Sequence, residues 1–315
     1  MQQPKISILI PTYNYARFIG QALQSLLRQD CTDFEVIISD DASTDGTEAV
    51  VRQHIGHDPR FIFHRHTTNL GMVANWNWCL AQAKGEYVQY LFGDDFFISP
   101  ATLSTLAKAL DAHPRATLAV SARRTADEHD MLGRRMLDLG KGGLYSGQAV
   151  IWHCLTHGEN KVGEPSVVMF RRAYADQGFD PHYKQLVDLA LWLRLCQQGE
   201  LVFIDTPLCA FRVHGLQQSA VNAQNKSTRL ELYELFRSYL PSSSHAVASP
   251  LLRLSYRTGV YRIMYQLRKD GLSAPPIMAA HQYLARLLPR PWYWIAACHY
   301  RLQRIQANFR RILDK

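Results

Sequence analysis

Short apolar runs alternate with amphipathic segments over the first two thirds of the chain. Runs with the composition of buried strands occur at residues 6–10, 34–38, 61–63, 118–120, 167–170 and 202–204, and another begins at Tyr87 and stops at Gly93. Between them, apolar side chains recur at helical spacing, as in residues 18–27, 73–83 and 100–110. The alternation predicts an α/β fold with a mostly parallel, Rossmann-like sheet flanked by helices.

Polar residues follow three of the predicted strands directly, at positions 12–13, 40–41 and 94–95. Right-handed crossovers place the carboxyl ends of parallel strands on one edge of the sheet, so we expect these residues to converge. Ligands bind at that edge in open α/β sheets. The sequence has neither GxGxxG nor GxxxxGK[ST], which argues against a dinucleotide dehydrogenase and a P-loop enzyme.

The adjacent carboxylates Asp94 and Asp95 fit two interpretations. As ligands they suit a hard divalent cation, Mn²⁺ or Mg²⁺, that also binds phosphate oxygens. As local structure they suit a polar turn after a strand. A related choice applies to Ser43 and Asp45, which we interpret as helix-capping residues, whereas Asp41 is interpreted as a binding residue.

Five segments resemble the family-two glycosyltransferases in both order and spacing. They are PTYN at 11–14, EVIISDDASTDGT at 35–47, NLG at 69–71, GEY at 85–87 and GDD at 93–95. The resemblance implies the GT-A fold, a nucleotide-sugar donor, a divalent cation and inversion at the anomeric carbon. It covers about two thirds of the chain and leaves out residues 226–315.

The resemblance also assigns roles by position. Nucleotide-sugar contacts are expected at Pro11, Thr12, Tyr13, Asp41, Asn69, Gly71 and Asp94, and a metal ligand at Asp95. The sequence departs from the family pattern where Phe92 or Gly93 replaces a third acid, and where Trp76 replaces an arginine. The second departure removes a cationic phosphate contact.

Asp188 is the expected catalytic base. It lies at the start of the apolar helix expected over residues 184–195, where a charge costs free energy unless it is paired or functional. The resemblance supports the role because Asp188 precedes a Leu-Trp-Leu-Arg helix, although Val187 stands where a glutamate is usual. The alternative is a carboxylate favoured by the helix dipole. Glu164 and Trp192 are further candidates for an acceptor or sugar contact, and Glu164 equally fits a solvated loop acid.

Residues 210–214, AFRVH, resemble the Tyr-Arg-x-His segment of the same family, with Phe211 in place of the tyrosine. Arg212 is expected to face the donor diphosphate. His214 is either a second metal ligand or a structural hydrogen-bonding residue. Residues 121–146 are polar and are expected to form a mobile or hairpin-like segment over the acceptor side. Residues 215–225 are also polar and are expected to be flexible until a donor orders them.

The positive charge is concentrated in the last hundred residues. Residues 1–215 hold 20 basic and 23 acidic side chains, a balance of −3, whereas residues 216–315 hold 15 and 4, a balance of +11. The final helix places Ile295, Leu302 and Ile305 on one face, together with Phe309 and Ile312. It fits a helix lying in the plane of an anionic membrane, or one packed on the catalytic domain.

The domain boundaries expected from these observations are 1–221 for a GT-A catalytic domain and 222–315 for a helical, basic C-terminal extension. Residues 1–98 would bind donor and metal, and residues 99–221 would supply the acceptor side and the base. There is no signal peptide, no apolar run of ~20 residues and no CxxC pair among the six cysteines. We therefore expect a cytoplasmic protein, peripheral on the inner face of the membrane.

The function expected is inverting transfer of a sugar from a UDP- or dTDP-sugar to a hydroxyl of a glycan or lipid-linked acceptor, in bacterial cell-surface polysaccharide assembly. A sugar-nucleotide nucleotidyltransferase would need basic residues near the first strand–helix turn, where only Arg17 stands. A nucleic-acid-binding protein would account for the basic C-terminal region. The chain carries no recognition module for nucleic acid, so no such partner is expected.

Overall fold

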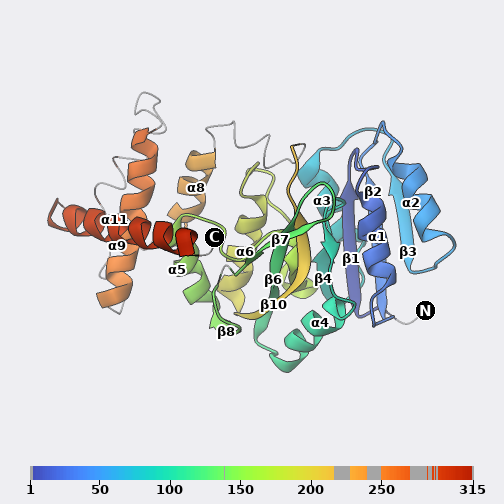
Figure 1. Cartoon of the computed structure of the whole chain (residues 1–315), viewed down its shortest axis with the longest axis horizontal. Helices are drawn as coiled ribbons and strands as arrows, with labels where there is room; N and C mark the ends of the chain where they lie inside the picture. The colour runs from blue at the N-terminus through green and yellow to red at the C-terminus, as the bar shows by residue number, and fades with distance from the viewer. Residues whose placement is uncertain are drawn as a thin grey trace. The chain divides into compact units, whose positions relative to one another are not determined.

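A computed structural model describes residues 3–137, 139–215, 228–239, 250–269 and 290–313, together with residues 282, 286 and 288 (Figure 1). The chain forms two compact units. Residues 1–150 and 161–220 make up the first, and residues 151–160 and 221–315 make up the second. The expected boundaries treated the two parts as consecutive, whereas the segment 151–160 joins the second unit.

Ten strands of the first unit form one sheet in the order β3-β2-β1-β4-β9-β6-β10-β5, with β7 beside β6 and β8 beside β10. The strands are β1 Ile6–Thr12, β2 Phe34–Asp40, β3 Phe61–Arg65, β4 Tyr87–Tyr90, β5 Phe96–Phe97, β6 Ala116–Ala126, β7 Leu132–Met136, β8 Gly143–Ser146, β9 Val168–Arg171 and β10 Glu200–Arg212. Strands β3, β2, β1 and β4 run parallel, as do β6 and β10. The predicted α/β fold with parallel strands is therefore confirmed.

Helices connect the parallel strands. They are α1 Ile19–Leu27, α2 Thr47–Ile55, α3 Met72–Gln82, α4 Thr102–Ala112, α5 Gly147–His157 and α6 Val187–Gln198, with short 3₁₀ turns η1 Pro165–Val167 and η2 Arg172–Tyr174. All seven residues of β1 and of β2 are buried, as expected for strands covered on both faces. Helix α1 buries Ile19, Ala22, Leu23 and Leu26, the apolar face that its periodicity predicts.

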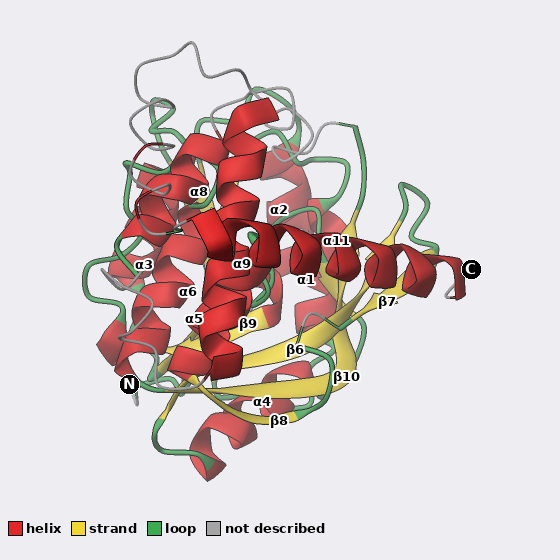
Figure 2. Cartoon of the chain, turned by 90° about the vertical axis from the view of Figure 1, so that its left-hand side faces the viewer, coloured by secondary structure: helices red, strands yellow, loops and turns green. Residues whose placement is uncertain are grey.

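The second half of the sheet differs most from expectation. Strand β9 is antiparallel to both of its neighbours, β4 and β6. Strand β6 continues through residues 121–126 and forms a hairpin with β7, in which Arg124 lies opposite Arg135. The hairpin interpretation of this stretch is confirmed, but its first six residues belong to a long central strand. Figure 2 shows β6, β9 and β10 as neighbouring strands.

The second unit contains helices α8 Thr228–Arg237, α9 Pro250–Lys269 and α11 Arg290–Leu313. Helix α11 packs on α9 through aromatic rings: the centroid of Tyr261 lies 5.0 Å from that of Tyr293 and 5.7 Å from that of Tyr300. Among the described residues, no helix combines the length and the apolar character that are needed to cross a membrane. The stretch predicted to be flexible, residues 215–225, lies outside the described residues except for Gly215.

Candidate active site

The ends of β1 and β2 meet as the sequence predicts. The backbone N–H of Asp41 donates to Thr12 O at 2.9 Å, and that of Asn14 donates to Ser43 Oγ at 2.8 Å. The hydroxyl of Tyr15 in turn donates to Oδ2 of Asp94 at 3.4 Å, which brings in the loop after β4. Residues 12–15, 41–43 and 94 therefore share one edge of the sheet, and the predicted convergence is confirmed.

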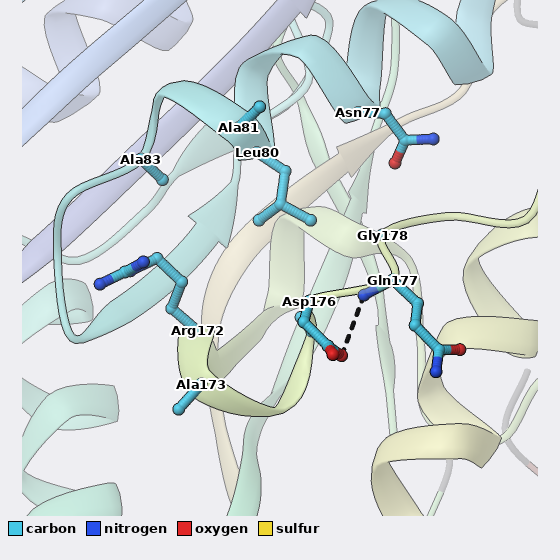
Figure 3. A pocket seen from close by; sticks show the side chains of 10 residues that line it. Asn77, Leu80, Ala81, Ala83, Arg172, Ala173, Asp176, Gln177 and Gly178 are labelled. Carbon is cyan, nitrogen blue, oxygen red and sulfur yellow. Dashed lines mark hydrogen bonds between the residues drawn. The ribbon is translucent and has the colours of Figure 1, made fainter.

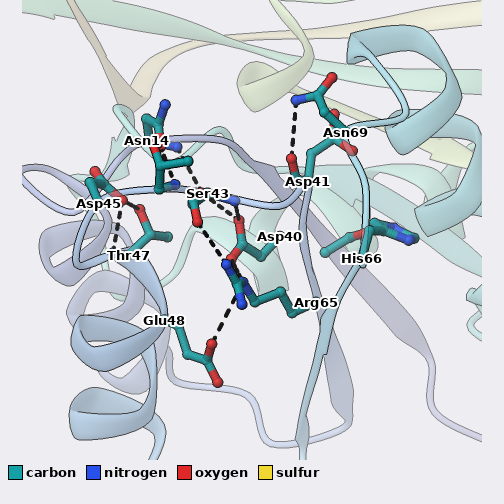
Figure 4. A network of polar contacts seen from close by, with 12 residues as sticks. Asn14, Asp40, Asp41, Ser43, Asp45, Thr47, Glu48, Arg65, His66 and Asn69 are labelled. Carbon is teal, nitrogen blue, oxygen red and sulfur yellow. Dashed lines mark hydrogen bonds and ion pairs between the residues drawn. The ribbon is translucent and has the colours of Figure 1, made fainter.

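Asp41 organises the side of this edge that lies near β3 (Figure 4). Its buried carboxylate accepts hydrogen bonds from Leu70 N at 2.6 Å and Gly71 N at 3.0 Å, while Asn69 Nδ2 donates to its carbonyl oxygen at 3.0 Å. The predicted contact residues Asp41, Asn69 and Gly71 are thus brought together. Each carboxylate oxygen can accept more than one hydrogen bond, so Asp41 retains acceptor capacity for a ligand.

Strand β1 supplies the surface next to Asp41. Pro11 and Thr12 are buried at the end of β1, whereas the side chain of Tyr13 is 46% exposed. Oγ1 of Thr12 is buried and has no hydrogen-bond partner in the structure. A buried hydroxyl without a partner costs free energy, and a bound polar group would remove that cost. This orphaned atom lies beside Gly93, where an added Cβ would approach it to 3.4 Å.

Ser43 does not cap a helix, which corrects the sequence interpretation. Its hydroxyl accepts from Asn14 N and bonds the carboxylate of Asp40, so it joins the loops after β1 and β2. Asp45 does accept from Thr47 N, the first residue of α2, at 2.9 Å, and also from Ala16 N at 3.1 Å. Asp45 therefore contacts the start of α2, as predicted, while also holding the chain that follows β1.

The two adjacent carboxylates have different surroundings. Both oxygens of Asp95 accept hydrogen bonds, Oδ2 from the Ser166 hydroxyl at 2.6 Å and Oδ1 from Arg212 N at 3.1 Å. Oδ2 of Asp94 faces Tyr15 and Nε2 of His214, the latter at 3.1 Å. Burial and the neighbouring charge of Asp94 raise the pKa of Asp95 well above its usual value. A cation beside the pair would oppose that rise.

Arg212 has a different position from the one predicted. Its guanidinium donates to Asp94 O at 2.8 Å, to Asp127 O at 2.9 Å, to the carboxylate of Asp130 and to the side-chain oxygen of Gln21. The side chain is 1% exposed. We therefore interpret Arg212 as the residue that ties the acidic loop to α1 and to the β6–β7 turn, in place of a diphosphate ligand.

The donor set around Asp94 fits a divalent cation that shares its ligands with a substrate. Among the residues described, no group of three or more His, Cys, Asp or Glu side chains is arranged to hold an ion by itself. Magnesium sites in phosphate-transferring enzymes commonly use one or two carboxylates and complete the shell with phosphate oxygens and water. Asp94, Asp95 and His214, grouped through their contacts, match that pattern.

Asp188 lies in the first turn of α6, where its Oδ1 accepts from Leu189 N at 2.7 Å. One helical turn later, Nε1 of Trp192 donates to Gly163 O at 3.1 Å. Gly163 is three residues before Ser166, which bonds Asp95. These contacts place the start of α6 beside the η1 segment that supports the acidic pair.

Burial and pairing bear on two weaker predictions at this side of the site. Trp192 is completely buried between Phe170 and Phe179, with centroid distances of 5.8 and 6.4 Å, so we interpret it as a core residue. The carboxylate of Glu164 forms an ion pair with the buried Arg123, whose Nη2 lies 3.0 Å from Oε1. The ion pair argues against a solvated loop acid, and contact of Glu164 with a sugar hydroxyl stays a prediction.

Three residues of the site are missing from the sequence prediction: Tyr15, Gln21 and Ser166. Tyr15 directly follows the PTYN segment, and burial together with the charges of Asp94 and Asp95 raises its pKa, so it stays a hydrogen-bond donor. Gln21 lies in the first turn of α1. Helical periodicity identifies the apolar face of that helix and does not single out a polar residue there. Ser166 had no local signal, because only the antiparallel insertion of β9 brings η1 to the acidic pair.

A cavity of about 490 Å³ lies between the end of α3 and the η2 turn (Figure 3). Its lining includes Asn77, Leu80, Arg172 and Asp176. Tyr87, the first residue of β4, pairs with Arg171, so the cavity lies near the start of β4, whereas Asp94 follows its end. None of the predicted site residues lines this cavity, and it is therefore not the candidate active site.

A Rossmann-like sheet whose carboxyl edge gathers Asp41, an acidic pair and a histidine is the arrangement expected of a GT-A glycosyltransferase. The sequence comparison agrees, since the model of Glycosyl transferase family 2 matches residues 7–179. The chain belongs to glycosyltransferase family 2 and is a glycosyltransferase enzyme.

Several curated relatives support the assignment. An uncharacterized protein of Mycobacterium tuberculosis is 32% identical over 67% of this chain and 67% of its own length. The putative glycosyltransferase EpsE of Bacillus subtilis is 26% identical over 85% of this chain and 97% of its own. A GalNAc(5)-diNAcBac-PP-undecaprenol beta-1,3-glucosyltransferase of Campylobacter jejuni is 36% identical over 35% of this chain and 36% of its own.

Solved structures show the same fold. The Staphylococcus aureus TarS fragment 1-349 in complex with UDP-GlcNAc superposes with a TM-score of 0.65 at 18% identity, over 91% of this chain and 82% of that chain. The mannosyltransferase PcManGT of Pyrobaculum calidifontis, in complex with GDP-Man and Mn²⁺, gives a TM-score of 0.54 at 20% identity, over 94% of this chain and 85% of that one. The GT-A fold is therefore confirmed.

Proposed function

We propose that this enzyme transfers a sugar from a UDP- or dTDP-sugar to a hydroxyl group, with inversion at the anomeric carbon. The observation that carries the proposal is the convergence of Thr12, Asp41 and Asp94 from three separate strand ends on one edge of the sheet. A hydrogen-bond acceptor for the nucleotide base and an acidic site for the diphosphate and its cation then lie along one edge of the sheet. Binding of a nucleotide-sugar requires both.

Asp41 would accept a hydrogen bond from the base. Uracil and thymine each present one ring N–H between two carbonyl oxygens, and a carboxylate fixed by two backbone amides is a preorganised acceptor for that N–H. Tyr13 directly follows Thr12 in the chain, and its exposed ring offers a surface on which the nucleotide base would stack. The UDP-GlcNAc named for the TarS structure is compatible with this choice, whereas the GDP-Man of PcManGT represents the competing base.

Asp94, Asp95 and His214 would hold the divalent cation. Asp94 and His214 contact each other directly, so they present adjacent oxygen and nitrogen ligands, while Ser166 and Arg212 fix the orientation of Asp95. When bound, the cation neutralises charge that develops on the leaving diphosphate. Mn²⁺ is named for one structural neighbour, and Mg²⁺ fits the same oxygen-rich set.

Asp188 would remove the proton from the acceptor hydroxyl as that hydroxyl attacks the anomeric carbon. Its position in the first turn of α6 lets the helix dipole favour the carboxylate form, which is the form that a base requires. Attack from the face opposite the leaving group gives inversion. Residues 1–98 would thus supply the donor side, and residues 99–221 the acceptor side and base.

The acceptor would be a glycan or a lipid-linked saccharide of the bacterial cell surface, used at the cytoplasmic face of the membrane. The support is the name of the Campylobacter relative, which describes a saccharide linked to undecaprenol through PP. The similarity to that relative extends over about a third of each chain. This reaction must follow a step that builds the shorter acceptor and precede one that extends or exports it.

Incubation with UDP-, dTDP- and GDP-sugars, with Mn²⁺, Mg²⁺ or a chelator, tests the donor and ion assignments together. We expect slow hydrolysis of one donor to nucleoside diphosphate and free sugar, stopped by the chelator. A nucleotidyltransferase would instead form a nucleotide-sugar from a nucleoside triphosphate and a sugar phosphate. The appearance of that product would overturn the proposal.

A further inference from the structure

Helix α11 has one face that packs on α9. Ala296, Ala297 and Tyr300 are buried, and Nδ1 of His299 lies 2.8 Å from Oγ1 of Thr258. At the start of the helix, the buried Arg257 stacks over the ring of Trp292 at 3.4 Å from its centroid. Helix α11 is therefore fixed on α9 by small and aromatic side chains, whereas Ile295, Leu302 and Ile305 from its amphipathic pattern are exposed.

These three residues and Trp294 form the uncovered face of α11. Trp294 is 68% exposed and Leu302 is 57% exposed, and Ile295 and Ile305 are about half exposed. At ~100° per residue, positions 294, 295, 302 and 305 fall within a ~100° arc, so they make one continuous stripe. Monomeric proteins rarely leave such a row of large apolar side chains in water without a binding role.

The positive charge of α11 indicates which kind of partner surface covers this stripe. The sequence of α11 contains five arginines and no acidic residue, and the exposed Arg301 lies at the edge of the stripe, next to Trp294 on the helix surface. A second copy of the chain would bring the same positive charges to the contact, with no carboxylate from this helix to pair them. An anionic lipid surface supplies the opposite charge together with an apolar phase below it.

We propose that the stripe of Trp294, Ile295, Leu302 and Ile305 inserts into an anionic membrane surface, with α11 lying in the plane of the interface. Tryptophan is enriched at this depth because its ring is apolar and its N–H is polar. Helix α11 is already folded against α9, so binding requires no ordering of a free peptide. The surface belongs to the second unit, and the proposal does not depend on the identity of the donor.

Vesicle flotation of the full chain tests the proposal. With phosphatidylcholine vesicles that contain a quarter of phosphatidylglycerol, we expect recovery with the vesicles and a blue shift of tryptophan emission. Leu302→Ser with Ile305→Ser should weaken binding by about tenfold or more, because two large apolar side chains no longer enter the bilayer. Arg301→Gln should weaken it by about fivefold at low salt and by less at high salt.

The control is Leu144→Ser, the same exchange at an exposed leucine of β8, which should bind as the unchanged protein does. Equal recovery with pure phosphatidylcholine vesicles, or no recovery with anionic ones, would overturn the proposal. So would a dimer in analytical ultracentrifugation that Leu302→Ser with Ile305→Ser converts to monomer. Donor hydrolysis should be unchanged in these variants, which separates failure of this surface from failure of the active site.

Discussion

Nε2 of His214 lies 3.1 Å from Oδ2 of Asp94, although 120 positions separate the two residues in the sequence. The contact joins the chain just after β10 to the loop after β4. The ring of His214 also packs on Phe18, with centroids 4.7 Å apart, so its orientation is fixed from the first helix as well. The candidate ion site is therefore assembled from three distant segments, and each of them can be tested separately.

Asp94→Asn should reduce Mn²⁺-dependent nucleotide affinity more than Asp95→Asn does. Asp94 contacts His214, whereas both oxygens of Asp95 accept hydrogen bonds from the protein. Loss of a residue that supports a metal ligand typically costs ~10–100-fold in metal affinity, and loss of a ligand costs at least as much. Calorimetric titration with UDP and Mn²⁺ measures both variants.

The matched control is Asp176→Asn, an exposed acid that lines the separate cavity, and we expect it to bind normally. Unchanged affinity in both the Asp94 and the Asp95 variants would contradict the assignment of this pair to the ion.

In the ion-free protein, Asp95 should contribute a loss of stability as the pH rises above ~4, the usual range of an aspartate in the unfolded chain. Because burial raises the pKa of Asp95 in the folded protein, the folded state holds a proton that the unfolded state releases, and unfolding becomes more favourable as the pH rises through that window. Urea unfolding in a chelator at a series of pH values measures the slope.

Asp95→Asn should flatten this slope, since an amide does not titrate, and Mn²⁺ should stabilise the unchanged protein more at neutral pH than at acid pH. A slope that is the same in the two proteins would assign the pH dependence to other groups.

Asp188→Asn should bind donor normally and lose turnover. The amide keeps nearly the shape of the carboxylate but cannot take the acceptor's proton, and a positioned base contributes typically ~10²–10⁴-fold in rate. Donor affinity by calorimetry and turnover with an acceptor are measured on the same preparation. Product NMR should show the anomeric configuration opposite to that of the donor, and retention would exclude this role for Asp188.

Arg212→Ala should destabilise the fold by about 2–4 kcal/mol, because it removes a buried guanidinium and leaves the carbonyl oxygens of Asp94 and Asp127 without that donor. Arg115→Ala is the matched comparison: its side chain is 82% exposed and it pairs with Glu200. The loss there should stay within about 1 kcal/mol. Comparable losses of unfolding free energy in urea would show that Arg212 is not structurally central.

Local patterns predicted well which strand ends meet at the site. Asp41 and Gly71 each stand in a short segment next to a strand, and parallel strands leave only one edge where those segments can meet. The rule that parallel strands end on one edge of the sheet needs no knowledge of side-chain contacts. It therefore found the convergence of 12–13, 41 and 94 from the sequence alone.

The acceptor half depends on contacts that a local pattern does not encode. Trp192 lies in a helix that matches the family, yet its burial between Phe170 and Phe179 follows from the packing of β9 and α6. Arg212 looked like a phosphate ligand because it is basic and near a histidine. Only the β6–β7 turn, which supplies Asp127 and Asp130, shows that its hydrogen bonds are used within the protein.

The position of Arg212 and His214 at the end of β10 has a consequence for protein synthesis. A ribosome adds residues from the N-terminus, so Asp94 and Asp95 emerge long before the strand that holds them. A nascent chain that ends at residue 179, where the family match stops, carries the acidic pair without either partner. On the proposed assignment, the ion site would therefore be completed only after β10 has joined the sheet.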